Sequence, residues 1–210
     1  MSLQKLFILG AGGHAKMVIE AIRSMGNADL IGCLDAKATQ REILGIPIES
    51  ETAEALQKML RAGAKAMVAI GDNALRERLT RQLYELGFQF ATPIAASAYV
   101  SPSATIAPGS VVMPKAAIGA MAVIGSGAII NTGATVDHDC RIGDFVHVAP
   151  GCHLAGGVAI DRGAMIGIGT CILPNVRIGP RAMVGANSTV LRDIPADSKW
   201  VGAPARPLDT

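Results

Sequence analysis

The sequence contains few aromatic residues, so other side chains must fill the interior of the protein. Phe, Trp and Tyr together make up 3% of the 210 residues, whereas 24 residues are glycine. Small and β-branched aliphatic residues dominate the remainder, and β-branched side chains favour extended backbone. This composition favours a fold built from narrow, regular layers over one with a bulky aromatic core.

The sequence also lacks an excess of charge of either sign. It has 19 basic and 17 acidic residues, which gives a net charge of +2. Nucleic-acid-binding proteins normally carry a block of positive charge, so we expect no nucleic acid among the partners.

The four cysteines, Cys33, Cys140, Cys152 and Cys171, form neither a C-x-x-C pair nor a zinc-ligand spacing. The apolar run at 6–9 is too short for a secretory leader and leads directly into Gly10. We therefore expect reduced, structural cysteines in a cytoplasmic protein.

One stretch without charge, residues 116–136, has the length and hydropathy of a membrane-spanning segment. Its aliphatic residues recur at a fixed spacing of six, which an ordinary membrane helix does not require. We therefore expect no membrane insertion.

That spacing belongs to a six-residue repeat that fills the second half of the chain. Every sixth residue from Val100 to Val190 is Val, Ile or Leu. The residue four places after each of them is usually small or β-branched, and the residue directly after each of them is often glycine, as at Gly119, Gly125 and Gly143. A period of six matches neither an α-helix nor a flat strand. A coil that turns a corner every six residues explains it, and glycine would suit each tight corner.

The first ninety residues have a different pattern, in which apolar strands alternate with amphipathic helices. We expect strands at 5–9, 31–34 and 66–70, helices at 17–25, 51–61 and 75–86, and a glycine-rich turn at 10–16. This alternation predicts a small parallel sheet. We therefore divide the chain into an α/β domain (1–92), a β-helix (93–194) and a C-terminal tail (195–210).

The glycine-rich turn offers a second interpretation of the α/β domain. Gly10, Gly12 and Ala15, followed by Asp35, fit the dinucleotide-binding fingerprint of a dehydrogenase. The α/β region is too short, however, for two mononucleotide-binding halves and a substrate domain. We therefore regard NAD chemistry as the weaker alternative.

The repeat resembles the hexapeptide-repeat acyltransferases, whose left-handed parallel β-helices form trimers and hold acetyl-CoA between neighbouring prisms. With its glycine-rich Rossmann-like half-domain in front, nearly the whole chain resembles the sugar-nucleotide N-acetyltransferases and sialic acid O-acetyltransferases. The resemblance implies a homotrimer that uses acetyl-CoA as co-substrate. Two alternatives share the fold: a non-catalytic β-helix scaffold, and a trimeric carbonic anhydrase with three histidines on a metal.

The spacing of the histidines in the repeat argues against the metal enzyme. On a coil of eighteen residues, His138, His147 and His153 fall on different faces of one prism. Three ligands of one metal ion must converge, and these three cannot do so within one chain. A site shared between subunits, which could use two of them, is the alternative, and we expect no metal.

The polar stretch 131–140 contains the candidate catalytic residues. His138 stands two places after the inward Val136, so its ring is expected to point outward. A neutral imidazole can take a proton from an attacking amine or hydroxyl, and Asp139 or Asp137 can hold its other nitrogen. By resemblance, His138 would be the general base, Asp139 its orienting partner, and His147 a contact near the acetyl carbonyl.

The resemblance also implies binding sites for the coenzyme and for a nucleotide-linked sugar. The coenzyme groove would include Gly156, Gly167, Gly185 and, in the tail, Arg206. Gly12, Gly13 and His14 would cradle the pyrophosphate, Asp35 would reach the base or ribose, and Gly71, Asp72, Asn73 and Arg76 would close the site. Packing alone is a rival explanation for the glycines. Some UDP-sugar members carry consecutive acidic residues at this point, whereas here Ala36 follows Asp35. The sequence therefore does not identify the nucleobase of the substrate.

The predicted activity is transfer of acetyl from acetyl-CoA to an amino group, the 4-amino group, of a nucleotide-linked dideoxy aminosugar in surface glycan biosynthesis. The alternative within the family is O-acetylation of sialic acid or a related sugar. The two reactions share every motif above, so the sequence does not separate them.

Overall fold

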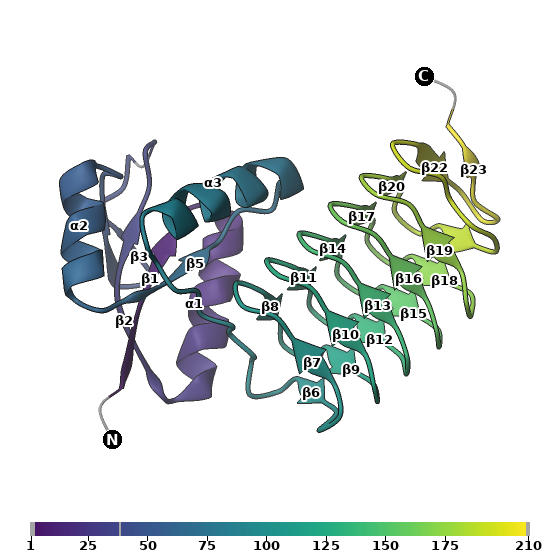
Figure 1. Cartoon of the computed structure of the whole chain (residues 1–210), viewed down its shortest axis with the longest axis horizontal. Coiled ribbons are helices and arrows are strands. Elements are labelled where there is room, and N and C mark those ends of the chain that lie inside the picture. The colour runs from purple at the N-terminus through teal and green to yellow at the C-terminus, as the bar shows by residue number, and fades with distance from the viewer. Residues whose placement is uncertain (1–2, 38, 209–210) are drawn as a thin grey trace.

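The computed structural model describes residues 3–37 and 39–208, which form an α/β domain and a long β-helix (Figure 1). The α/β domain contains β1 (Gln4–Leu9), α1 (Gly13–Met25), β2 (Ala28–Leu34), β3 (Glu42–Ile43), β4 (Ile46–Glu49), α2 (Ala53–Arg61), β5 (Lys65–Val68) and α3 (Asn73–Glu85). Its sheet has the order β3-β4-β2-β1-β5. All its pairings are parallel except β3 with β4.

Alternate residues of β1 point to opposite faces of this sheet, and each face is covered by helices. Leu6 and Ile8 pack with α1, whereas Phe7 and Leu9 pack with residues of α2 and α3. The predicted parallel sheet is therefore present. The β3–β4 hairpin was not predicted, and α1 begins at Gly13 instead of Met17.

The β-helix consists of two-residue strands at the predicted spacing. They are β6 (Tyr99–Val100), β7 (Thr105–Ile106), β8 (Val111–Val112), β9 (Ala117–Ile118), β10 (Val123–Ile124), β11 (Ile129–Ile130), β12 (Thr135–Val136), β13 (Arg141–Ile142), β14 (His147–Val148), β15 (His153–Leu154), β16 (Ala159–Ile160), β17 (Met165–Ile166), β18 (Cys171–Ile172), β19 (Arg177–Ile178), β20 (Met183–Val184) and β21 (Thr189–Val190). Two further strands, β22 (Lys199–Val201) and β23 (Arg206–Pro207), follow at the end farthest from the α/β domain (Figure 1).

Three parallel sheets form the sides of the prism, since each strand pairs with the strand eighteen residues later. Ile124, for example, lies opposite Ile142, and Ile142 lies opposite Ile160. From Val112 to Val190 these aliphatic residues are buried, while Val100 and Ile106 in the first coil are partly covered. A fully buried aliphatic side chain contributes about 1.5–3 kcal/mol, so the stacked ladder is the main source of stability in this half of the chain.

The expectation that glycine makes the corners was wrong for the position directly after each aliphatic residue. A Cβ on Gly119 would lie 2.8 Å from backbone atoms of the next coil, so glycine there allows close approach of the coils. The residue with left-handed backbone lies two places after this position, as at Met121 (φ 59°) and Asp139 (φ 60°). The corner is therefore turned by a residue that is often not glycine.

Residues 116–136, which have membrane-like hydropathy, form β9 to β12 and the turns between them. Among the described residues, no helix has the length and apolar character needed to span a membrane.

The α/β domain packs directly on the first coils of the prism. Val111, Met113 and Ile129 share one apolar cluster with Ile19 and Ile22 of α1. Ile94, within the predicted range of the β-helix (93–194) but before the repeat starts at Val100, pairs with Val112. The two parts are thus held together by a common core.

Candidate active site

The turn between β12 and β13 presents His138 to solvent. Its side chain is 61% exposed, and its Nδ1 lies 2.8 Å from Oδ2 of Asp139. Because an ionised carboxylate only accepts hydrogen bonds, the neutral ring must carry its proton on Nδ1. The lone pair of Nε2 is then free to accept a proton.

The acidic neighbours strengthen His138 as a base. The hydrogen bond to Asp139 raises the pKa of His138 above its ordinary value of 6.5, and the charge of Asp137 acts in the same direction. Asp137 also accepts a hydrogen bond from the backbone N–H of His138 at 2.7 Å. The left-handed backbone of Asp139 favours Gly, Asn or Asp, so this corner suits the carboxylate that the ring needs.

Of the glycines predicted to line the coenzyme groove, Gly156 is the one that lies beside His138. A Cβ on Gly156 would lie 2.5 Å from Cε1 of His138, so glycine is needed for the ring to occupy its place. Gly167 and Gly185 lie at a different corner, where a Cβ would approach the neighbouring coil to 2.6 Å. Close packing of the coils therefore accounts for these two glycines without a ligand.

Arg206 lies on β23 in the last coil and is exposed. Its Nη1 donates to the carbonyl oxygen of Ala205 at 2.9 Å. The guanidinium is thus accessible to an anion.

His147 lies on another side of the prism, on β14, and is 9% exposed. Its Nδ1 is 3.3 Å from the carbonyl oxygen of Gly71, and its Nε2 is 3.1 Å from Nδ2 of Asn131. Burial, with a contribution from Arg76, lowers the pKa of His147 to about 4, so the ring is neutral at neutral pH. One chain does not bring His138 and His147 together.

His14, in the first turn of α1, is close to His147. Their ring centroids are 6.4 Å apart. Burial, followed by the effect of His147, lowers the pKa of His14 to about 4. Its Nε2 is buried and has no hydrogen-bond partner among the described residues. A buried polar atom without a partner is costly, so this nitrogen is suited to a ligand.

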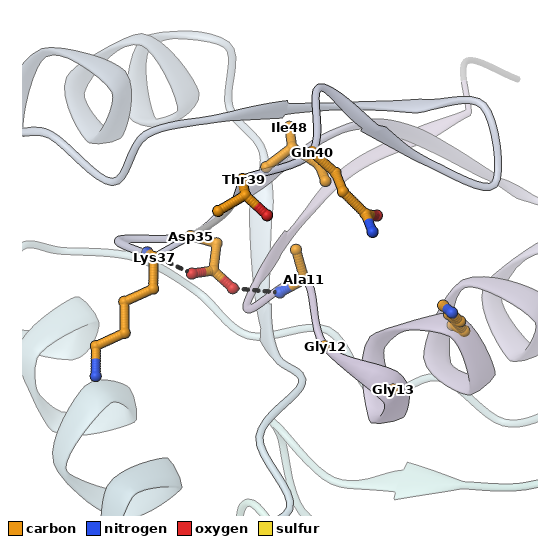
Figure 2. Close-up of a pocket in the computed structure, with 9 residues that line it drawn as sticks. Ala11, Gly12, Gly13, Asp35, Lys37, Thr39, Gln40 and Ile48 are labelled. Carbon is orange, nitrogen blue, oxygen red and sulfur yellow. Dashed lines mark hydrogen bonds between the residues drawn. The ribbon is translucent and has the colours of Figure 1, made fainter.

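The glycine-rich turn and Asp35 line a cavity of about 350 Å³ (Figure 2). Oδ2 of Asp35 accepts from the backbone N–H of Ala11 at 2.7 Å, and Oδ1 accepts from that of Lys37 at 2.7 Å. α1 begins beside this cavity at Gly13, with Gly12 as a cap that supplies no side chain. The free N–H groups of such a helix start attract anions.

The sequence did not indicate Thr39, Gln40 and Ile48 as part of the cavity wall, nor Lys16 and Lys37, which also line it (Figure 2). The first three lie on or near the β3–β4 hairpin.

The structure corrects the expectation that Arg76 closes the nucleotide site. Its side chain is 1% exposed. Nε donates to Gly127 O, Nη1 to the carbonyl oxygens of Ile70 and Gly71, and Nη2 to Asn73 Oδ1 and Phe145 O. A guanidinium has five N–H groups, and these contacts use all of them. Arg76 is therefore a residue of the domain interface and has no donor left for a nucleotide.

Its neighbours in the predicted site also make internal contacts. Nδ2 of Asn73 donates to the carbonyl oxygens of Gly163 and Ala164 at 3.0 and 3.1 Å. Asp72 caps α3, because its Oδ1 accepts from the N–H of Leu75 at 2.8 Å. Gly71 is exposed, at the carboxyl end of the sheet. Of this predicted group, Gly71 is thus the residue best placed to meet a ligand.

Within residues 3–37 and 39–208, no three His, Cys, Asp or Glu side chains form a group able to hold a metal ion. His153 lies apart from the other histidines of the prism, with its Nδ1 2.9 Å from Oγ1 of Thr135.

Comparisons with protein families match both halves of the chain. The family of the PglD N-terminal domain matches residues 5–83, and the bacterial transferase hexapeptide (six repeats) matches residues 157–192. A comparison with curated proteins found no match.

Solved structures match over nearly the whole chain. PerB from Caulobacter crescentus, in complex with CoA and GDP-perosamine, is 41% identical, with 98% of this chain and 97% of that chain covered and a TM-score of 0.91. The acetyltransferase domain of PglB from Neisseria gonorrhoeae, in complex with acetyl coenzyme A, is 38% identical, with 98% and 100% covered and a TM-score of 0.91. WeeI from Acinetobacter baumannii is 26% identical, with 98% and 100% covered and a TM-score of 0.86.

Proposed function

Because the chain belongs to the hexapeptide-repeat nucleotide-sugar N-acetyltransferases, we propose that it acetylates the 4-amino group of a nucleotide-linked dideoxy aminosugar. Membership in this family confirms the predicted resemblance, the Rossmann-like half-domain and the left-handed parallel β-helix. It also confirms an acetyl-CoA-dependent acyltransferase, as opposed to a dehydrogenase or a scaffold. A cytoplasmic location and a role in surface polysaccharide biosynthesis are part of the proposal.

The observation that carries the proposal is the pair formed by His138 and Asp139. The pair leaves Nε2 of His138 unprotonated and exposed, while Asp139 stabilises the imidazolium that forms when Nε2 takes a proton. The nitrogen of the sugar forms a bond to the acetyl carbonyl carbon and gives its proton to Nε2. The C–S bond then breaks, and the proton passes to the departing thiolate. General base catalysis of this kind contributes about 10²–10⁴ in rate.

A second observation supports the binding of a nucleotide-linked sugar by the α/β domain. The uncapped start of α1, at Gly12 and Gly13, is suited to a pyrophosphate, and the cavity beside Asp35 is suited to the ribose or base. The unpartnered Nε2 of His14 is suited to a polar group of the sugar.

The separation of these two groups within one chain supports a homotrimer. His138 lies at the corner after β12, whereas His14 and His147 lie where β14 meets the α/β domain. Prisms packed side by side would bring His138 of one copy close to the glycine-rich turn (10–16) of the next copy, with acetyl-CoA between them. His147 would then lie near the acetyl carbonyl, and Arg206 is available for a coenzyme phosphate.

The relatives give the best indication of which nucleobase the sugar substrate carries. PerB binds GDP-perosamine, an amino sugar linked to a nucleotide. A GDP-linked 4-amino sugar is therefore the first substrate to test, followed by UDP- and dTDP-linked sugars and free sialic acid.

The test measures release of CoA thiol from acetyl-CoA with each acceptor, with product identification by mass spectrometry. We expect turnover with at least one nucleotide-linked aminosugar and an amide in the product. Turnover with sialic acid alone would overturn N-acetylation in favour of the O-acetylation alternative. Absence of turnover with every acceptor would reject the proposal altogether.

A further inference from the structure

Arg76 joins the loop at the end of the sheet to two coils of the prism. On one side it donates to the carbonyl oxygens of Ile70 and Gly71, in the segment after β5. On the other side it donates to the carbonyl oxygens of Gly127 and Phe145, 51 and 69 residues away in the sequence. The position of this loop relative to the prism is therefore set by one buried guanidinium.

The carbonyl oxygen of Gly71 is shared between two donors. Nη1 of Arg76 approaches it at 3.2 Å, and Nδ1 of His147 approaches it at 3.3 Å. A carbonyl oxygen only accepts, so the His147 contact requires a proton on Nδ1.

The other side of the His147 ring leads independently to the same tautomer. Oδ1 of Asn131 accepts from the N–H of Thr132 at 2.8 Å, which directs Nδ2 of Asn131 toward Nε2 of His147. An amide nitrogen only donates, so Nε2 must be the acceptor and carry no proton. Both contacts thus agree on a neutral ring with its proton on Nδ1.

We propose that Arg76 is a positioning residue, which fixes the Gly71 carbonyl and thereby holds His147 as the neutral Nδ1–H tautomer that accepts from Asn131. The positive charge of Arg76 acts in the same direction, because it contributes to the lowered pKa of His147. The consequence for catalysis rests on the proposed function, in which His147 lies near the acetyl group.

A purely structural role for Arg76 predicts a different set of results. In that case, loss of Arg76 would lower stability without altering the tautomer of His147. A matched control is available in the adjacent residue of α3. Oε1 of Glu77 lies 2.6 Å from Nη2 of Arg162, so Glu77 also links α3 to the prism but does not touch Gly71.

The first experiment determines the tautomer in the wild-type chain by ¹⁵N NMR of protein labelled at histidine, with a His147→Gln variant to assign the signals. We expect a protonated Nδ1 and an unprotonated Nε2 at pH 7. A proton on Nε2 would overturn the proposal. This readout does not depend on acetyl transfer, so it stands even if the proposed function fails.

The second experiment compares Arg76→Lys with Glu77→Gln. A lysine ammonium has three donors in place of five, so it cannot hold both carbonyls of the loop and both corners of the prism. We expect Arg76→Lys to mix the tautomers of His147 and to lower kcat about 10–100-fold with little change in KM for acetyl-CoA, because small displacements of positioned groups have effects of this size. The kcat of Glu77→Gln should stay within about twofold of the wild-type value, because exposed ion pairs contribute little.

An unchanged tautomer of His147 in Arg76→Lys would overturn the positioning role, whatever the effect of the variant on kcat. If this variant does not fold, Asn73→Ala removes one acceptor of Arg76 and leaves the other four. It also removes the two bonds from Nδ2 to Gly163 and Ala164, so the tautomer of His147 is the readout for this variant. Asn73→Ala should mix the tautomers of His147 to a smaller extent than Arg76→Lys, and an unchanged tautomer would again overturn the proposal.

Discussion

Asp139 holds its carboxylate 2.8 Å from Nδ1 of His138 although the two residues are adjacent in the sequence. Side chains of adjacent residues in an extended strand point to opposite faces and do not meet in this way. The left-handed backbone of Asp139, with φ of 60°, turns the chain so that the carboxylate and the ring come together. The contact between His138 and Asp139 thus depends on the corner.

Replacement of His138 by alanine should abolish most of the activity. We expect acetyl transfer to fall by about 10²–10⁴ because the general base is lost. The thermal midpoint should stay nearly unchanged, since the side chain is 61% exposed. Initial rates of CoA release and a thermal scan of the same preparation provide the measurement. A fully active variant would refute the role of His138 as the general base.

Asp139→Asn should change the pH dependence of the reaction. Asparagine tolerates the left-handed backbone but carries no charge, so the pKa of His138 should fall back toward its ordinary value. The base form then predominates from a lower pH, and the acidic limb of the kcat profile should move to lower pH. The plateau should fall about tenfold, because the imidazolium is less well stabilised. An acidic limb at the wild-type position would exclude Asp139 as the orienting group.

Val136→Asp should unfold the prism. Val136 is 1% exposed within the aliphatic ladder, and a carboxylate there has no partner to offset its loss of hydration. We expect a loss of more than about 3 kcal/mol in the free energy of unfolding, measured by circular dichroism in urea. Val123→Asp is a suitable control, because Val123 is 47% exposed on the same prism. Equal stability of the two variants would contradict the inward register.

The stability of the protein should decline in mildly acidic solution because of His147. Its pKa is about 4 in the folded chain and 6.5 in the unfolded chain, so the unfolded chain binds the proton first. Stability is therefore complete above pH 6.5 and falls as the pH decreases toward 4. At pH 5 the loss from this ring is about 2 kcal/mol.

His147→Gln tests this dependence, because glutamine does not titrate. Urea unfolding at pH 7.5 and pH 5 should show a smaller acid-induced loss in the variant than in wild type. If both proteins lose the same free energy, His147 is not the group responsible. His14, whose pKa is also lowered to about 4, contributes a loss of the same sign in both proteins.

The β-helix could be predicted almost completely, because its core repeats at a fixed interval along the sequence. Each inward aliphatic residue contacts its counterpart eighteen residues away, so the pattern that forms the core is visible in the chain itself. The exposed corner at His138 follows from the same register. What the repeat did not reveal was which corner residue takes the left-handed backbone, because Met121, Asp139 and Asn175 occupy that position without a common side chain.

The interface between the two halves could not be predicted in the same way. The partners of Arg76 on the prism are backbone carbonyls, which carry no signature of residue type. A charged residue soon after the loop at Gly71 therefore resembled a nucleotide ligand, although it is buried. The sequence identified His147 by its spacing of nine residues from His138. It did not show that the ring of His147 faces Gly71, because that contact too is with a backbone carbonyl.

From Gly109 to Asn187 every sixth residue has left-handed backbone, and Asn175 (φ 62°) lies two coils beyond Asp139 at the same corner. The pair of His138 and Asp139 therefore occupies a corner of the ordinary kind, and only the side chains on it are special. A histidine and an acid grafted onto residues 174–175 should adopt the geometry of the natural pair if glycine also replaces Arg192, which stands where Gly156 makes room for the ring of His138. Such a graft would remain inactive unless the sugar and the thioester also bound beside that coil. The positions at which the two substrates bind along the prism would therefore decide which corner can catalyse transfer.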